Sequence, residues 1–142
     1  MRIIAGQRPQ AQSDCLKLRD LLEREQVQDV DKPMRAMEQS WVELCLDHTD
    51  AAIWLAQRAT ELLPLSRDAF YGVPYIAGLA QINAQAGHPK EAVALLEQLL
   101  SIPAGQTVSI ERLKLDPVWD PVRKDPRFQK LLSEGAARMA RP

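Results

Sequence analysis

Apolar residues recur at helical spacing along most of this chain, most clearly in residues 71–103. Two apolar patterns meet there at Gly87-His88-Pro89. Glycine is common where a helix ends in a left-handed residue, and proline is common in the first turn of a helix. The pattern therefore predicts two antiparallel helices joined by a very short turn. Their predicted inward residues are Ile76, Leu79, Ala80 and Ile82 in the first helix, and Ala92, Val93, Leu95, Leu96, Leu99 and Leu100 in the second.

The same spacing predicts further helices on both sides of this hairpin, so the fold class is expected to be all-α. Ser13 or Asp14 can cap the first helix, which places Cys15, Leu18 and Leu22 on one face. Thr49 is the expected cap of the third helix, and a turn is expected at residues 104–107. The expected helices cover residues 14–27, 33–47, 50–63 and 126–137, whereas residues 108–115 suit either a short helix or an extended cover.

The chain also resembles itself after a shift of 40 residues. This shift places His48 on His88, Ala52 on Ala92 and Leu55 on Leu95. Internal similarity of this kind is typical of stacked helical pairs.

The spacing of small residues and turns resembles the tetratricopeptide repeat. In the second copy the matching positions are Ala80, Gly87, Ala92, Leu96 and Pro103, and in the first they are Asp47, Ala52, Ala59 and Pro64. The resemblance implies antiparallel helical hairpins stacked as a short right-handed solenoid. The first copy departs from the family at Ser40 and Glu43, where apolar residues are usual, and the second departs at Leu99, where alanine is usual.

Three Asp-Pro pairs follow, beginning at Asp116, Asp120 and Asp125. Each aspartate can cap a helical turn that starts with its proline. With Trp119 and Phe128, this tail resembles the segment that closes tetratricopeptide arrays in many bacterial signalling proteins. There, such arrays follow a kinase, a nucleotide cyclase or a DNA-binding regulator domain. The expected organisation is a loose lead-in over residues 1–10, tetratricopeptide-like repeats over 11–104 and a C-terminal cap over 105–142.

Net charge is -1 over 142 residues, so no global field attracts the chain to nucleic acid or to a membrane. The charge is uneven, because residues 11–50 hold five Lys/Arg and ten Asp/Glu, while residues 110–142 hold eight and five. Cys15 and Cys45 belong to no metal-binding spacing, and buried reduced thiols are expected. No stretch approaches 18 apolar residues. We therefore expect a soluble, cytoplasmic chain.

Catalytic chemistry finds little support in the sequence. His48 and His88 occupy equivalent turns, where a paired metal or acid–base site is conceivable. Neither histidine has an organised set of carboxylate or thiolate partners nearby in the sequence, so a turn-capping or exposed role is favoured. The phosphate-cradle, zinc-protease and serine-hydrolase motifs are absent from the sequence. We expect no enzyme activity, no cofactor and no metal.

A small basic cluster in the tail raises the question of nucleic-acid binding. The favoured alternative is that Trp119 and Phe128 pack over the last hairpin while the three aspartates neutralise the bases. The cluster consists of Arg123, Lys124, Arg127 and Lys130.

The most promising binding residues lie in the helix over 33–47, where Met34, Met37, Trp41 and Leu44 form a stripe. In the family's register this stripe faces the inner groove, where such arrays hold partners. Alternatively the helix is rotated, or the helix over 14–27 covers the stripe. The predicted protein-binding residues are Met34, Met37, Trp41, Ala77, Gln81 and Gln85.

The predicted function is that of a non-enzymatic scaffold that binds a protein, a peptide or a second copy of itself, as the regulatory part of a bacterial signalling system. Two alternatives stay open. One is a structural, oligomerising end piece of a larger array, and the other is a small enzyme that uses His48 or His88.

Overall fold

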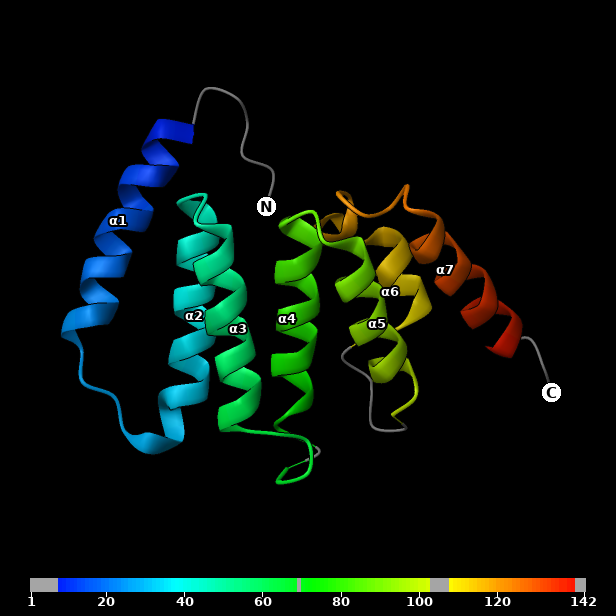
Figure 1. The fold of residues 1–142 in the computed structure, drawn as a ribbon, viewed down its shortest axis with the longest axis horizontal. Helices are drawn as coiled ribbons and strands as arrows, with labels where there is room; N and C mark the ends of the chain where they lie inside the picture. Colours follow the sequence, from blue (N-terminus) through cyan, green and yellow to red (C-terminus); the bar gives the residue numbers. More distant parts are fainter. Residues whose placement is uncertain (1–7, 69, 103–107, 140–142) are drawn as a thin grey trace.

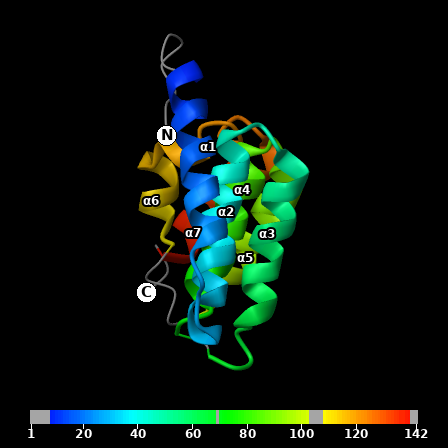
Figure 2. The same cartoon turned by 90° about the vertical axis from the view of Figure 1, so that its left-hand side faces the viewer.

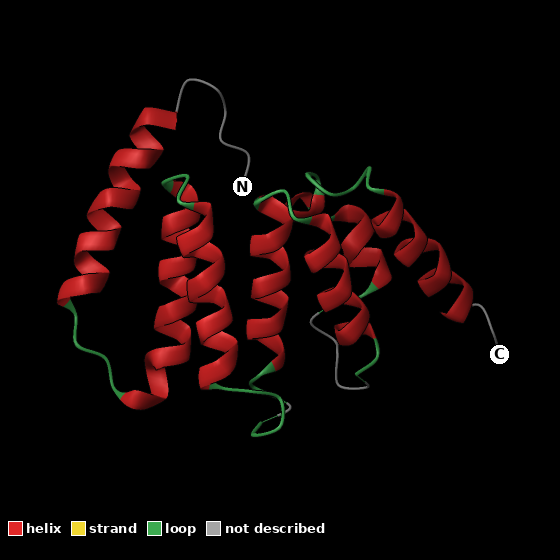
Figure 3. Ribbon diagram, viewed as in Figure 1, coloured by secondary structure: helices red, strands yellow, loops and turns green. Residues whose placement is uncertain are grey.

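The computed structural model describes residues 8–68, 70–102 and 108–139, and this part of the chain forms seven α-helices packed in sequential pairs. Figure 3 shows that its regular elements are helical throughout, so the all-α prediction is confirmed. The α-helices are α1 (Arg8–Arg24), α2 (Lys32–Cys45), α3 (Thr49–Leu62), α4 (Val73–Gln85), α5 (Pro89–Leu100), α6 (Ile110–Leu115) and α7 (Pro126–Met139); the 3-10 helices are η1 (Asp29–Asp31) and η2 (Pro117–Trp119).

The two helical hairpins, α2–α3 and α4–α5, have turns of the same backbone form. Asp47 has a φ of 64° and Gly87 a φ of 78°, and these residues are 40 positions apart. The next residue in each turn donates its amide to a carbonyl five residues back, His48 to Glu43 and His88 to Asn83, both at 2.9 Å. Gly87 and Pro89 therefore take the predicted places at the end of α4 and the start of α5.

The start of the first helix and the cap of the third differ from the predictions. α1 begins at Arg8, inside the expected lead-in, so Ser13 and Asp14 lie within the helix and do not cap it. His48, not Thr49, is the residue before α3. The predicted turn at 104–107 and residues 1–7 lie outside the described residues.

α4 stands in the middle of the row of helices (Figure 1) and has a long run of buried residues, from Ile76 to Ala84 with one interruption. The larger apolar cluster joins α4 and α5 to the C-terminal segment, and the smaller one joins α3 to α4. The larger cluster buries alanines of α4 and α5 and the smaller one alanines of α3, and these small side chains let the helices approach closely. The smaller cluster consists of Ala52, Ala56, Leu79 and Ile82, with Met37 and Leu44 of α2 packed against it.

The C-terminal segment covers one end of the row through its aromatic residues. Trp119 and Phe128 are buried, with stacked rings whose centroids are 6.2 Å apart. The carboxylates of Asp116 and Asp125 accept hydrogen bonds from the amides of Val118 and Arg127, as the Asp-Pro pattern predicts. Packing of both aromatic rings against the hairpin is therefore confirmed.

Candidate interaction surface

The stripe on α2 divides into an inner and an outer pair. Met37 and Leu44 are partly buried against the small cluster shared by α3 and α4. Met34 and Trp41, seven residues apart on one side of the helix, are 50% and 36% exposed. The helix α1 therefore does not cover the whole stripe, and the outer pair of the stripe, Met34 and Trp41, reaches the surface.

The predicted residues of α4 are less accessible. Ala77 is buried in the core cluster that also contains Trp119, and Gln85 donates its side-chain amide to the carbonyl of Val118 in η2. Ala77 is therefore part of the core, and Gln85 is engaged by the C-terminal segment. Gln81 stays half-buried.

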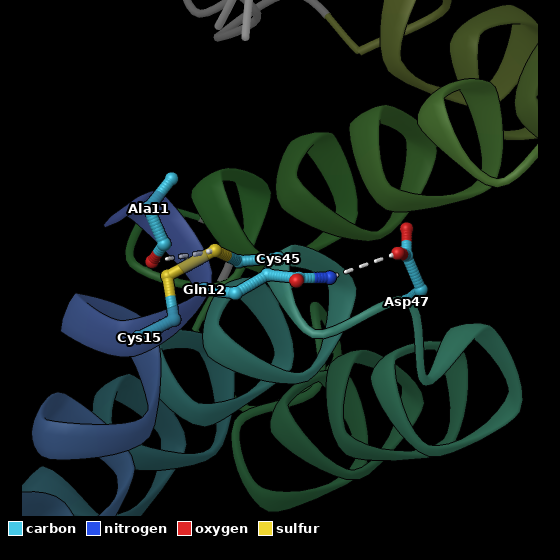
Figure 4. The surroundings of a disulfide bond; sticks show 5 residues. All are labelled: Ala11, Gln12, Cys15, Cys45 and Asp47. Carbon is cyan, nitrogen blue, oxygen red and sulfur yellow. Dashed lines mark hydrogen bonds between the residues drawn. A yellow bond between two sulfur atoms is a disulfide. The ribbon is translucent and has the colours of Figure 1, made fainter. Parts of the chain in front are cut away.

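A disulfide between Cys15 and Cys45 fastens α1 to the C-terminal end of α2, with 6.4 Å between the two Cα atoms (Figure 4). Beside it, the Gln12 side-chain amide donates to the carboxylate of Asp47 at 3.3 Å. The expectation of two reduced thiols is therefore wrong, and the cysteines no longer support the expectation of a cytoplasmic chain. The sequence gives no sign of this pairing, because it depends on how α1 folds back onto α2.

Arg35 of α2 holds the C-terminal end of α1. One guanidinium nitrogen donates to the carbonyl of Leu22 at 2.7 Å, and a second donates to the carboxylate of Glu25. The third, Nε, lies 3.3 Å from the carboxylate of Glu38. Among the described side chains of α1 only Leu22 is buried, so α1 is attached chiefly by the disulfide at its middle and by Arg35 at its C-terminal end.

Two leucines of α1 extend the exposed apolar surface. Leu18 and Leu21 are 43% and 61% exposed and share one side of the helix. The sides of α1 and α2 that are opposite to these four apolar residues line a small cavity toward α3. Leu18 and Leu21 therefore lie on the side of α1 away from α3, and Met34 and Trp41 lie on the corresponding side of α2. That cavity is lined by Arg19, Glu23, Gln39, Val42, Glu43 and Leu55.

We call the four residues Leu18, Leu21, Met34 and Trp41 the α1–α2 face. Figure 2 looks onto α1, with α3 on one side of the row of helices and α6 on the other. The sequence prediction missed the two leucines, because it placed Leu18 on the inward side of its helix. The one feature of the sequence that could have indicated these two leucines is their position between Asp14 and Glu25 at helical spacing.

The electrostatic environment beside this face is acidic. Burial raises the pKa of the Tyr75 hydroxyl, and the nearby carboxylates of Asp31 and Glu38 raise it further. Lys32 donates to Asp29 and lowers the pKa of that carboxyl group. Asp31 and Glu38 therefore lie near Tyr75, which is in the first turn of α4.

The two histidines do not form a paired site with described partners. His48 Nδ1 lies 2.6 Å from the carboxylate of Glu43, within its own hairpin. In the ranges that the structure describes, no group of three or more His, Cys, Asp or Glu side chains is placed to hold a metal ion.

A cavity of about 610 Å³ lies between α5, α6 and α7, and its lining includes both apolar side chains and the carboxylates of Glu97 and Glu134.

No helix in the described part of the chain is long and apolar enough to cross a bilayer. Comparison with protein-family models, with curated proteins and with solved structures finds no match to this chain. The α1–α2 face is therefore the feature on which a functional proposal rests.

Proposed function

We propose that this chain is a non-enzymatic helical scaffold that binds a protein or peptide through the α1–α2 face. The observation that carries the proposal is the exposure of four large apolar side chains on two adjacent helices, among them Trp41. Contiguous exposed apolar residues commonly mark interaction sites. Tryptophan is also enriched among the residues that dominate binding energy.

The proposed architecture is a short right-handed solenoid of degenerate tetratricopeptide-like hairpins, closed by the segment over 105–142. The matching left-handed turns at Asp47 and Gly87 support it, as do the buried alanines Ala52 and Ala92 at equivalent places. In such arrays the first helix of each pair lines the binding surface. By this resemblance, the chain serves as the regulatory part of a bacterial signalling system.

The compartment follows from the cysteine pairing. Disulfides persist mainly in oxidising environments, because cytosolic thiols are kept reduced. We therefore favour an oxidising compartment over the cytoplasm for the form in which Cys15 and Cys45 are joined.

The test compares two tryptophans. Trp41 belongs to the α1–α2 face, whereas Trp54 of α3 is 62% exposed on a different helix. Immobilised wild type, Trp41→Ala and Trp54→Ala would be used to capture partners from an extract of the native host. We expect a partner that binds wild type and Trp54→Ala but binds Trp41→Ala about tenfold more weakly or worse. Equal capture by all three proteins would contradict the proposal.

A further inference from the structure

Carboxylates flank the apolar residues of the α1–α2 face on both helices. On α1, Asp14 precedes Leu18 and Leu21 at helical spacing, and Glu25 follows directly after the helix ends. On α2, Glu38 lies between Met34 and Trp41 at helical spacing, and Asp31, the last residue of η1, directly precedes the helix. Residues three or four apart lie on the same side of a helix, so each helix has a stripe of apolar residues bordered by carboxylates.

The two stripes lie next to each other. Arg35 contacts Glu25 from one stripe and Glu38 from the other, so these carboxylates share one guanidinium group. The disulfide joins the middle of α1 to the C-terminal end of α2. The face is therefore one surface built from two antiparallel helices.

Three of the five basic side chains in residues 11–50 pair with carboxylates near this surface. The Arg35 side chain is only 13% exposed and contacts Leu22, Glu25 and Glu38. Lys17 pairs with Asp14 at 3.5 Å, and Lys32 pairs with Asp29. Residues 11–50 carry ten acidic and five basic side chains, so the part of the chain that contains this face has a net negative charge.

We infer that the partner of this face is an amphipathic helix with Lys or Arg residues on both sides of its apolar stripe. This inference rests on the proposed function and names the partner class. Two packed helices offer ridges and grooves onto which a third helix can pack. α1 has 17 residues and is about 25 Å long, which matches a helical partner of four to five turns. The flanking cations would meet the carboxylates that border Leu18, Leu21 and Met34.

The probes are three synthetic 18-residue peptides labelled with fluorescein. The first has leucines at helical spacing with lysines on either side, the second has glutamates in place of the lysines, and the third has the lysine peptide's composition in scrambled order. Fluorescence anisotropy measures their binding to the oxidised full chain at low and high salt. We expect the lysine peptide to bind most tightly and to weaken as salt rises.

Matched variants then identify the face. Asp14→Asn with Asp31→Asn removes two flanking carboxylates, and Asp50→Asn with Glu61→Gln makes the same charge change on α3. The first pair should weaken binding of the lysine peptide roughly three- to tenfold, since each exposed charge pair contributes little. The second pair should leave it unchanged. Circular dichroism of each variant verifies that the helices are intact.

The outcomes separate this inference from the proposed function. If the lysine and glutamate peptides bind equally, and Trp41→Ala weakens both, the face binds helices without charge selection and only the inference is wrong. If neither peptide binds, or if Trp41→Ala has no effect on binding, the face is not a helix-binding surface and the inference is overturned. The proposed function then depends on the capture experiment alone.

Discussion

Single residues decide how each hairpin turns, and the left-handed residue at the end of each first helix is the critical one. Gly87 has a φ of 78°, and a Cβ placed on it meets no atom within 4 Å. A side chain there would therefore strain only the backbone. Asp47 adopts a similar φ of 64° in the other turn, which is consistent with the tolerance of aspartate for left-handed geometry.

We predict that Gly87→Ala destabilises the fold by about 1–2 kcal/mol, because alanine disfavours positive φ. Gly87→Asn should cost less, since asparagine tolerates this conformation better. Urea denaturation followed by circular dichroism measures both changes. An alanine variant as stable as wild type would mean that the turn does not have the described backbone conformation.

At the residue scale, Arg123 explains why the basic cluster of the tail is a weak candidate for nucleic-acid binding. Its guanidinium group donates to the carbonyls of Leu113, Lys114 and Asp116 and pairs with Asp120. Arg127 pairs with Asp125, and Lys130 with Glu134. Arg123 thus closes the C-terminal end of α6, and neighbouring carboxylates offset the charges of Arg127 and Lys130.

At the scale of elements, α1 depends on two attachments to α2, one at its middle and one at its C-terminal end. It contributes one buried residue, Leu22, among those whose burial is described, whereas α4 contributes nine. The disulfide to Cys45 and the contacts of Arg35 therefore hold a helix that has little core of its own.

We predict that reduction of Cys15–Cys45 loosens α1 and lowers the free energy of unfolding by about 2–4 kcal/mol, the usual range for a disulfide. Hydrogen exchange under reducing conditions should show lost protection in residues 8–24, while α4 and α5 keep theirs.

The double variant Cys15→Ser with Cys45→Ser is the control, because it should behave like the reduced protein and no longer respond to reductant. Equal protection of α1 in the oxidised and reduced protein would show that α1 is held without the disulfide.

At the scale of the whole molecule, charge is distributed unevenly from one end of the chain to the other. Residues 11–50 carry a net charge of -5, from five basic and ten acidic side chains, while residues 110–142 carry +3, from eight and five. Two copies of the acidic α1–α2 face would repel each other at close range. Self-association through this face is therefore disfavoured.

We predict a monomer at all concentrations in light scattering, both for wild type and for Trp41→Ala. A dimer that Trp41→Ala dissociates would instead make the α1–α2 face a contact between copies. A dimer that salt dissociates and Trp41→Ala leaves intact would point to attraction between the acidic and the basic end.

Much of the local structure follows from the sequence alone, because it depends on neighbouring residues. The periodicity of apolar residues predicts α2 to α5 within a few positions, Gly87 and Pro89 predict the second turn, and the Asp-Pro pairs at 116 and 125 predict the capped turns of the tail. The offset of 40 residues between the two turns is visible in the sequence and also in the structure.

The tertiary structure alone decides which of these helical sides remain exposed. Periodicity shows that a helix has an apolar side, but it does not show which neighbour covers that side. Ala77 and Gln85 are covered because the tail folds back onto α4, and Gln85 meets Val118 across 33 residues. Cys15 and Cys45 meet across 30 residues because α1 lies on α2. Leu18 and Leu21 stay exposed because α1 is held by the Cys15 disulfide and by Arg35, and only Leu22 of its described side chains is buried.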